Sequence, residues 1–144
     1  MGLESALLRQ LPRTKLCAMC QKHPRTPVVI DHFARIGADG TIRSKDLDDL
    51  CALARHQSVR VKLSAFYALG KKKAPYLDLG PMIRRLLDAF GPERLMWASD
   101  CPFQILGGHH YADSIDLIRQ RLDFLAASDR DWLLRRAAEQ TVFG

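Results

Sequence analysis

Hydrophobic residues along the chain gather into three short runs, and a segment with helical periodicity follows each of them. The runs are Val28–Ile30, Val59–Leu63 and Leu95–Ala98. Their β-branched and large apolar side chains are typical of buried strands. The pattern therefore predicts three strands that lie inside the fold.

Helical periodicity is found in residues 44–57, 80–95 and 112–125, and a last helix is expected to follow Ser128. Ser44 is the expected N-cap of the first of these helices, because its hydroxyl can accept a hydrogen bond from the first turn. Strands that alternate with helices predict a parallel sheet with helical crossovers. The fold class is therefore α/β, with parallel strands and helices outside them.

Length and composition are those of an ordinary soluble protein. The chain has 144 residues, enough for a single domain over 1–144, and is 47% hydrophobic and 26% charged. No run approaches the roughly 18 apolar residues that a membrane-spanning helix needs. Four cysteines without a visible signal peptide predict reduced thiols in a cytoplasmic protein.

The net charge of +6 does not by itself indicate a nucleic-acid partner. The 22 basic residues are spread along the chain among 16 acidic ones. The one basic run, Lys71 to Lys73, falls in a predicted loop. We therefore expect neither nucleic acid nor a membrane as a partner.

Polar residues follow each predicted strand at the point where it ends. Asp31 and His32 follow the first, Ser64 the second and Asp100 the third. The carboxyl ends of parallel strands meet at one edge, where α/β proteins place their active sites. A carboxylate at the end of an apolar run is costly unless something pairs with it, so Asp100 has either a structural partner or a ligand.

Each of these residues also has a structural interpretation. Asp100 could cap a loop, His32 could be satisfied in the core by the backbone, and Asp31 could accept hydrogen bonds from loop amides. Ser64 could cap the loop that follows its strand. Lys62 lies on the same face of its strand as Ser64, and we expect it to pair with a carboxylate.

Two further motifs are weak. Cys17 and Cys20 form a C-x-x-C pair, but zinc modules need a second pair, and Met19 and Cys20 also fit an apolar helical face. Core packing is the favoured interpretation. The stretch Gly107-Gly108-His109-His110 is expected to be a surface loop that could contact a substrate.

Three segments, "TPVVIDHFARIG", "VRVKLSAFYALG" and "FGPERLMWASDCPF", resemble the C-terminal part of the amidohydrolase-related proteins. These are metal-dependent hydrolases with a TIM-barrel fold, also called the amidohydrolase 2 group. The matching patterns are "DH" after one strand, "VKLS" along the next, and G-x-x-R-x-x-x-x-SD-x-P around the last. The resemblance is strongest over residues 24–144.

The resemblance implies that the three strands are the sixth to eighth of a (β/α)₈ barrel, which is incomplete here. Asp100 would then be a metal ligand and a catalytic residue, and His32 a catalytic residue that transfers protons or orients the substrate. The implied cofactor is a divalent metal, zinc or alternatively manganese. The implied reaction is hydrolysis of a C–N or C–O bond in a small amide, ester or lactone. Decarboxylases and lactonases belong to the same family.

The chain departs from the family pattern in one important respect. The family's H-x-H from the first strand has no counterpart, since no two of the five histidines are separated by a single residue. We therefore expect a C-terminal portion, arising from truncation, a misplaced start or a split protein, that binds metal weakly alone. It would self-associate or require an N-terminal complement. The alternative is a non-catalytic remnant or interaction fragment.

Overall fold

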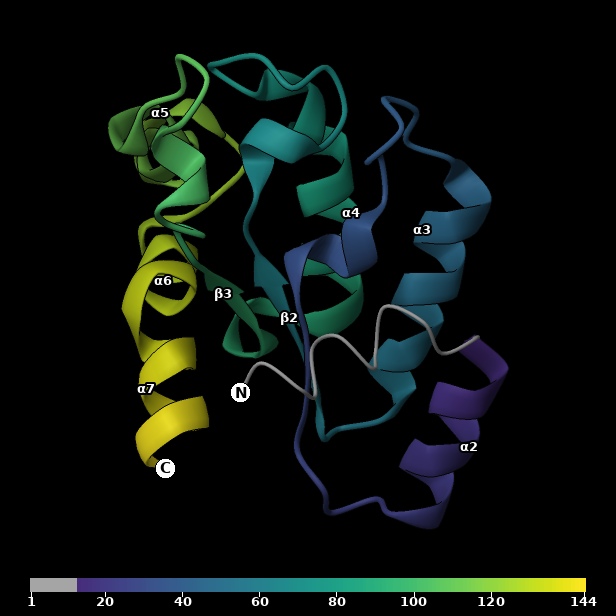
Figure 1. Ribbon diagram of the computed structural model, residues 1–144. Helices are drawn as coiled ribbons and strands as arrows, with labels where there is room; N and C mark the ends of the chain where they lie inside the picture. The colour runs from purple at the N-terminus through teal and green to yellow at the C-terminus, as the bar shows by residue number, and fades with distance from the viewer. Residues whose placement is uncertain (1–12) are drawn as a thin grey trace.

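The computed structural model describes residues 13–144, which form a three-stranded parallel sheet with helices around it (Figure 1). The strands are β1 (Val28–Ile30), β2 (Val59–Leu63) and β3 (Leu95–Trp97), in the order β1-β2-β3. The predicted α/β fold and strand order are confirmed. The third strand ends one residue earlier than predicted, although the amide of Ala98 still donates to the carbonyl of Leu63 at 3.2 Å.

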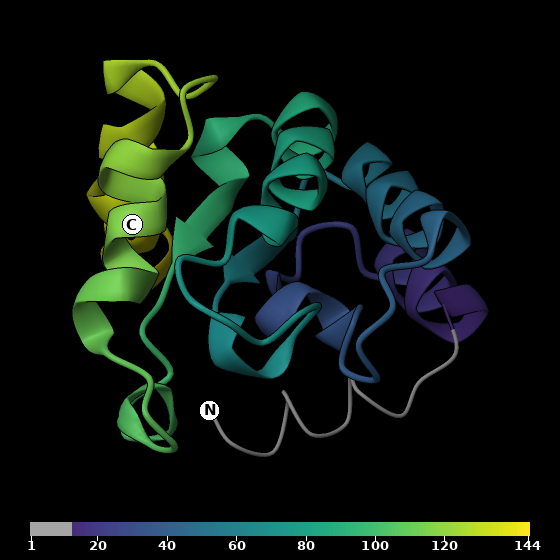
Figure 2. The same cartoon turned by 90° about the horizontal axis from the view of Figure 1, so that it is seen from above.

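The crossover helices lie on one face of the sheet, and the C-terminal helices lie beside β3 (Figure 2). The α-helices are α2 (Arg13–Lys22), α3 (Ser44–Cys51), α4 (Gly80–Phe90), α5 (Tyr111–Asp116), α6 (Ala127–Asp131) and α7 (Ala137–Phe143). Two π-helical segments, η7 (Leu117–Arg121) and η8 (Trp132–Arg136), extend α5 and α6. Short 3₁₀ turns are η1 (His32–Arg35), η2 (Ala52–Arg55), η3 (Phe66–Ala68), η4 (Leu77–Leu79), η5 (Pro92–Arg94) and η6 (Phe103–Ile105).

The core lies between the sheet and the helices. Alternate residues of the central strand, Val59, Val61 and Leu63, are fully buried there. Ile83 and Leu86 of α4 are fully buried in the same cluster, so this helix lies over the sheet with its apolar stripe inward. The other residues of β2, Arg60 and Lys62, therefore point to the opposite face of the sheet.

Arg94, the arginine of the G-x-x-R pattern, has a structural role. Its guanidinium donates to the carbonyls of Phe90 at 3.0 Å, Ala54 at 2.9 Å and His56 at 3.1 Å. These bonds tie the end of α4 to the turn before β2. Gly91 makes the connection possible, because it adopts a φ of +74° that favours glycine.

Three local predictions were wrong. Arg43, not Ser44, lies at the N-cap of α3. The last helical region begins at Ala127, because the Asp129 carboxylate accepts a hydrogen bond from the Ala126 amide at 2.9 Å and fixes an earlier start. Met19 is exposed, since it lies about 100° around the helix from the buried Cys20.

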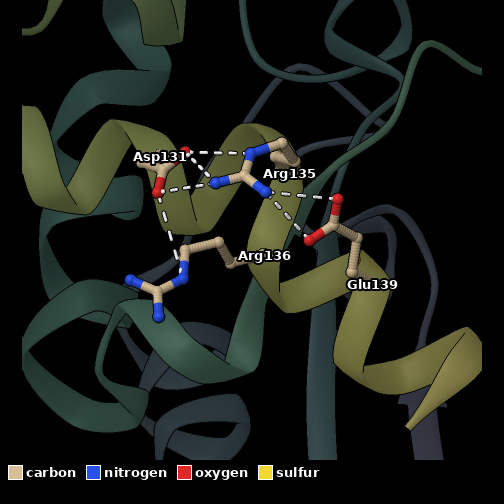
Figure 3. A network of polar contacts seen from close by, with 4 residues as sticks. All are labelled: Asp131, Arg135, Arg136 and Glu139. Carbon is tan, nitrogen blue, oxygen red and sulfur yellow. Dashed lines mark hydrogen bonds and ion pairs between the residues drawn. The ribbon is translucent and has the colours of Figure 1, made fainter.

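Charged side chains form a network on the outer surface of the C-terminal helices (Figure 3). Arg135 donates to the carboxylates of Asp131 and Glu139, one helical turn away on either side, and Arg136 lies 3.9 Å from Asp131. These groups are largely exposed, so water and salt screen each pair and its contribution to stability is small. The network stabilises the helix and lies away from the strand ends.

The helices of residues 13–144 are all too short or too polar to cross a membrane.

We expect Leu86→Ala to lower the free energy of unfolding by about 2–5 kcal/mol, because it leaves a cavity under α4 that the sheet cannot fill. Urea denaturation measures the change. Leu77→Ala is the matched control, since Leu77 is 52% exposed and its truncation should change the stability little. Equal losses in the two variants would contradict the placement of the core.

Candidate active site

The three parallel strands bring their carboxyl ends to one edge, as the sequence predicts. Ser64 directly follows β2. His32 follows β1 with one residue between them, and Asp100 follows β3 with two residues between them. Side chains from segments more than thirty residues apart in sequence therefore meet at this edge.

His32 and Asp100 lie close together at this edge. The His32 Nε2 atom is 3.7 Å from Asp100 Oδ1, and the two side chains are 15% and 20% exposed. Both residues adopt left-handed backbone conformations, with φ of 52° and 56°. Such conformations are unfavourable for non-glycine residues and often occur at functional sites.

Ser64 holds the other side of the imidazole. Its fully buried hydroxyl lies 2.7 Å from His32 Nδ1. A serine hydroxyl can donate or accept, so this contact is compatible with a proton on either nitrogen of His32. The predicted loop-capping role of Ser64 is replaced by a role in orienting this histidine.

Tyr67 is a site residue that sequence reasoning missed. Its hydroxyl donates to Asp100 Oδ2 at 2.8 Å. Burial, together with this hydrogen bond, raises the pKa of Tyr67 to about 12. Ala65, in a left-handed conformation, turns the chain after β2 and so aids this placement. The one sequence signal was a tyrosine three residues after the strand-end serine.

Asp100 therefore has partners on both carboxylate oxygens. Tyr67 binds Oδ2, and Oδ1 faces His32. The carboxylate is paired, as its position after an apolar run required. It remains partly accessible, so a small molecule could still reach it.

Lys62 pairs with a carboxylate, as expected from the alternation of its strand. Its Nζ lies 2.9 Å from Asp31 Oδ1, in an ion pair that does not meet hydrogen-bond geometry. Within residues 13–144, the Asp31 Oδ1 atom accepts no hydrogen bond, and its partner is the Lys62 ammonium rather than a loop amide. The pair anchors the residue before His32 to the central strand.

The stretch at 107–110 is a surface loop, as expected, except that the side chain of His109 turns inward. His110 is exposed, but His109 is half-buried, and its Nδ1 lies 2.7 Å from the Tyr76 hydroxyl. The ring of His109 is also 5.9 Å from the ring of Tyr67. This loop therefore folds back toward the candidate site.

The described residues fit only part of a metal centre. Within residues 13–144, no group of three or more His, Cys, Asp or Glu side chains is placed to hold an ion. Asp100 and His32 offer one carboxylate and one imidazole, whereas a catalytic zinc usually has three protein ligands. The described residues alone therefore do not form a complete centre.

The C-x-x-C pair has the structural role that we favoured. Cys20 is buried in the core, and Cys17 is partly buried against it. Burial raises the pKa of the Cys20 thiol, and the neighbouring Cys17 adds to this effect. A thiol held protonated in the core is a poor metal ligand.

A family model described as amidohydrolase, Amidohydro_2, matches residues 9–143. The chain belongs to the amidohydrolase family. Among curated proteins it is 35% identical over 102 residues to L-fucono-1,5-lactonase of Burkholderia ambifaria, covering 70% of this chain and 34% of that protein. It is 32% identical over 76 residues to 4-sulfomuconolactone hydrolase of Hydrogenophaga intermedia, covering 53% and 25%.

Solved structures of this amidohydrolase family show the same fold. A zinc-bound amidohydrolase from Burkholderia multivorans is 27% identical with a TM-score of 0.76, over 90% of this chain and 48% of that one. A Pseudomonas putida protein assigned as a 2-pyrone-4,6-dicarboxylic acid hydrolase is 26% identical with a TM-score of 0.72, over 93% and 48%. The chain thus spans about half of these structures and about a third or less of the curated relatives.

These similarities confirm the predicted family and the partial α/β barrel. They also show that a divalent metal occurs in the family, since one related structure contains zinc. The roles of His32 and Asp100 remain predictions.

We expect Tyr67 to make stability fall between about pH 10 and pH 12. Its folded pKa is raised to about 12 from 10.0, so in this range the folded chain keeps a proton that the unfolded chain has lost. The stabilisation is complete below pH 10 and is lost as the pH approaches 12. Tyr67→Phe should remove this component, measured as the difference between the two urea-denaturation profiles against pH. Parallel profiles across this range would show that neither burial nor Asp100 raises the pKa of Tyr67.

We expect the purified chain to retain less than one equivalent of zinc or manganese after dialysis, because the described residues provide too few ligands. Elemental analysis measures the retained metal. A stoichiometric ion that is lost in Asp100→Asn would show instead that the chain carries a complete site.

Proposed function

We propose that this chain contributes the His32–Asp100 side of the active site of a metal-dependent hydrolase that opens small lactones or esters. The observation that carries the proposal is the imidazole and carboxylate 3.7 Å apart at the carboxyl edge of the sheet. Both lactonase relatives named above support the substrate class, since their names describe lactone opening. The domain over 1–144 would be part of a (β/α)₈ barrel.

In the proposed reaction, water adds to the carbonyl carbon of the lactone and the ring C–O bond breaks, giving a hydroxy acid. Asp100 Oδ1 would accept the proton of the attacking water. His32 would take that proton from Asp100, 3.7 Å away, and pass it to the departing ring oxygen, while Ser64 would support either protonation state of the imidazole. Tyr67 would keep the Asp100 carboxylate in its orientation by holding Oδ2.

A divalent metal would lower the pKa of the attacking water and polarise the carbonyl. Asp100 is the residue of this chain that we propose as a ligand, with zinc as the favoured ion because a related structure contains it. The remaining ligands would come from the barrel portion that this chain does not span. We therefore propose an N-terminal barrel complement as the partner, with self-association as the alternative.

A complementation assay tests this function. The chain would be mixed with the N-terminal barrel portion of Burkholderia ambifaria L-fucono-1,5-lactonase, ending before the strand that corresponds to β1, in the presence of zinc. We expect the mixture to hydrolyse L-fucono-1,5-lactone. Asp100→Asn and His32→Gln should lower the rate by about 10²–10⁴-fold, because each removes a proton-transfer group.

Asp88→Asn is the matched control, since it makes the same chemical change on the outer surface of α4 and should leave the rate unchanged. A complex that forms but does not hydrolyse lactones would contradict the proposed function. Failure of the two parts to associate would favour the non-catalytic alternative. A rate indifferent to Asp100→Asn would exclude the proposed role of this carboxylate.

A further inference from the structure

A single side chain, that of Tyr67, connects the ring of His109 to the Asp100 carboxylate. Its ring stacks on that of Tyr76, with centroids 6.0 Å apart and an angle of 20°, and lies 5.9 Å from the ring of Tyr67. The Tyr67 hydroxyl in turn donates to Asp100. Gly107 and Gly108, with φ of 63° and 81°, form the turn that returns the chain toward Tyr76.

A buried glutamine fixes this arrangement. Gln104 is fully buried, although its neighbours Phe103 and Ile105 are more than half exposed. Its Nε2 atom donates to the carbonyl of His110 at 3.3 Å and to the hydroxyl of Tyr76 at 3.1 Å. A backbone carbonyl can only accept, so the side-chain atom beside it must be the amide nitrogen rather than the oxygen.

The direction of these hydrogen bonds favours one position for the proton of His109. The Tyr76 hydroxyl accepts from Gln104, so its own proton is available for His109 Nδ1, 2.7 Å away. The Nδ1 atom is then an acceptor, and a neutral His109 carries its proton on Nε2. Gln104 is held through its amide nitrogen alone, because its buried Oε1 atom has no hydrogen-bond partner within residues 13–144.

We propose that His109 is a further side chain of the active site, held by Gln104 and Tyr76 as the Nε2–H tautomer, and that it donates a hydrogen bond to an oxygen of the lactone or ester substrate. The inference rests on the proposed function and names a substrate-binding group for it. A neutral donor suits an uncharged lactone oxygen, which can only accept. His109 and Asp100 would then bind opposite kinds of group, an acceptor and a donor.

The tautomer can be measured in the isolated chain by ¹⁵N NMR with labelled histidine. We expect His109 to show a proton on Nε2 and a hydrogen-bonded, unprotonated Nδ1. Tyr76→Phe should shift the Nδ1 resonance, and His110→Gln, a matched change in the neighbouring exposed histidine, should leave it in place. A proton on Nδ1 in the wild-type chain would overturn the inference, whether or not Tyr76→Phe folds.

The substrate contact can be measured in the complemented mixture. His109→Phe keeps a ring but removes the donor, and we expect kcat/KM for L-fucono-1,5-lactone to fall about 10-fold or more. His109→Gln keeps a donor and should retain more of the activity, while His110→Gln should change nothing. An active wild-type mixture with unchanged kcat/KM in His109→Phe would overturn this inference alone. An inactive wild-type mixture would overturn it together with the proposed function.

Discussion

The parallel pairing of β2 with both neighbours is the constraint on which the candidate site depends. Val61 is in register with Ile30 on one side and with Leu95 on the other. A shift of one residue would turn the buried alternate residues of a strand to its opposite face, so the core between sheet and helices fixes this register. The same register sets the positions of His32 and Asp100 relative to Ser64, because each follows its strand by a fixed number of residues.

The face of the sheet opposite the core carries two basic side chains of β2, Arg60 and Lys62. An apolar core would not tolerate these charges. Lys62 has a partner in Asp31, and the two stay partly accessible. Arg60 lies two residues earlier on the same face, and its buried Nε has no hydrogen-bond partner in residues 13–144. Burial, with Arg60 nearby, also lowers the pKa of Arg94. This face therefore favours acidic or polar groups as neighbours rather than an apolar sheet partner.

The sequence could predict what depends on local periodicity. The strands, their order, the crossover helices and the edge where His32 and Asp100 meet all follow from alternation along the chain. The Tyr67–Asp100 contact could not be predicted in this way, because its partners are 33 residues apart and meet only through the turn at Ala65. Helix starts were also missed, since the Asp129 contact with the Ala126 amide competes with an ordinary serine cap.

The loop after β3 is held in a different way from the rest of the fold. Phe103, Ile105 and Leu106 are more than half exposed, so opening this loop would uncover little additional apolar surface. Its position depends instead on the hydrogen bonds of Gln104 to Tyr76 and to the His110 carbonyl. Segments with few buried apolar contacts open at lower free energy than the core. The edge of the sheet thus combines a carboxylate held by the Tyr67 hydroxyl with a histidine on a loop whose position depends on polar contacts rather than on apolar packing.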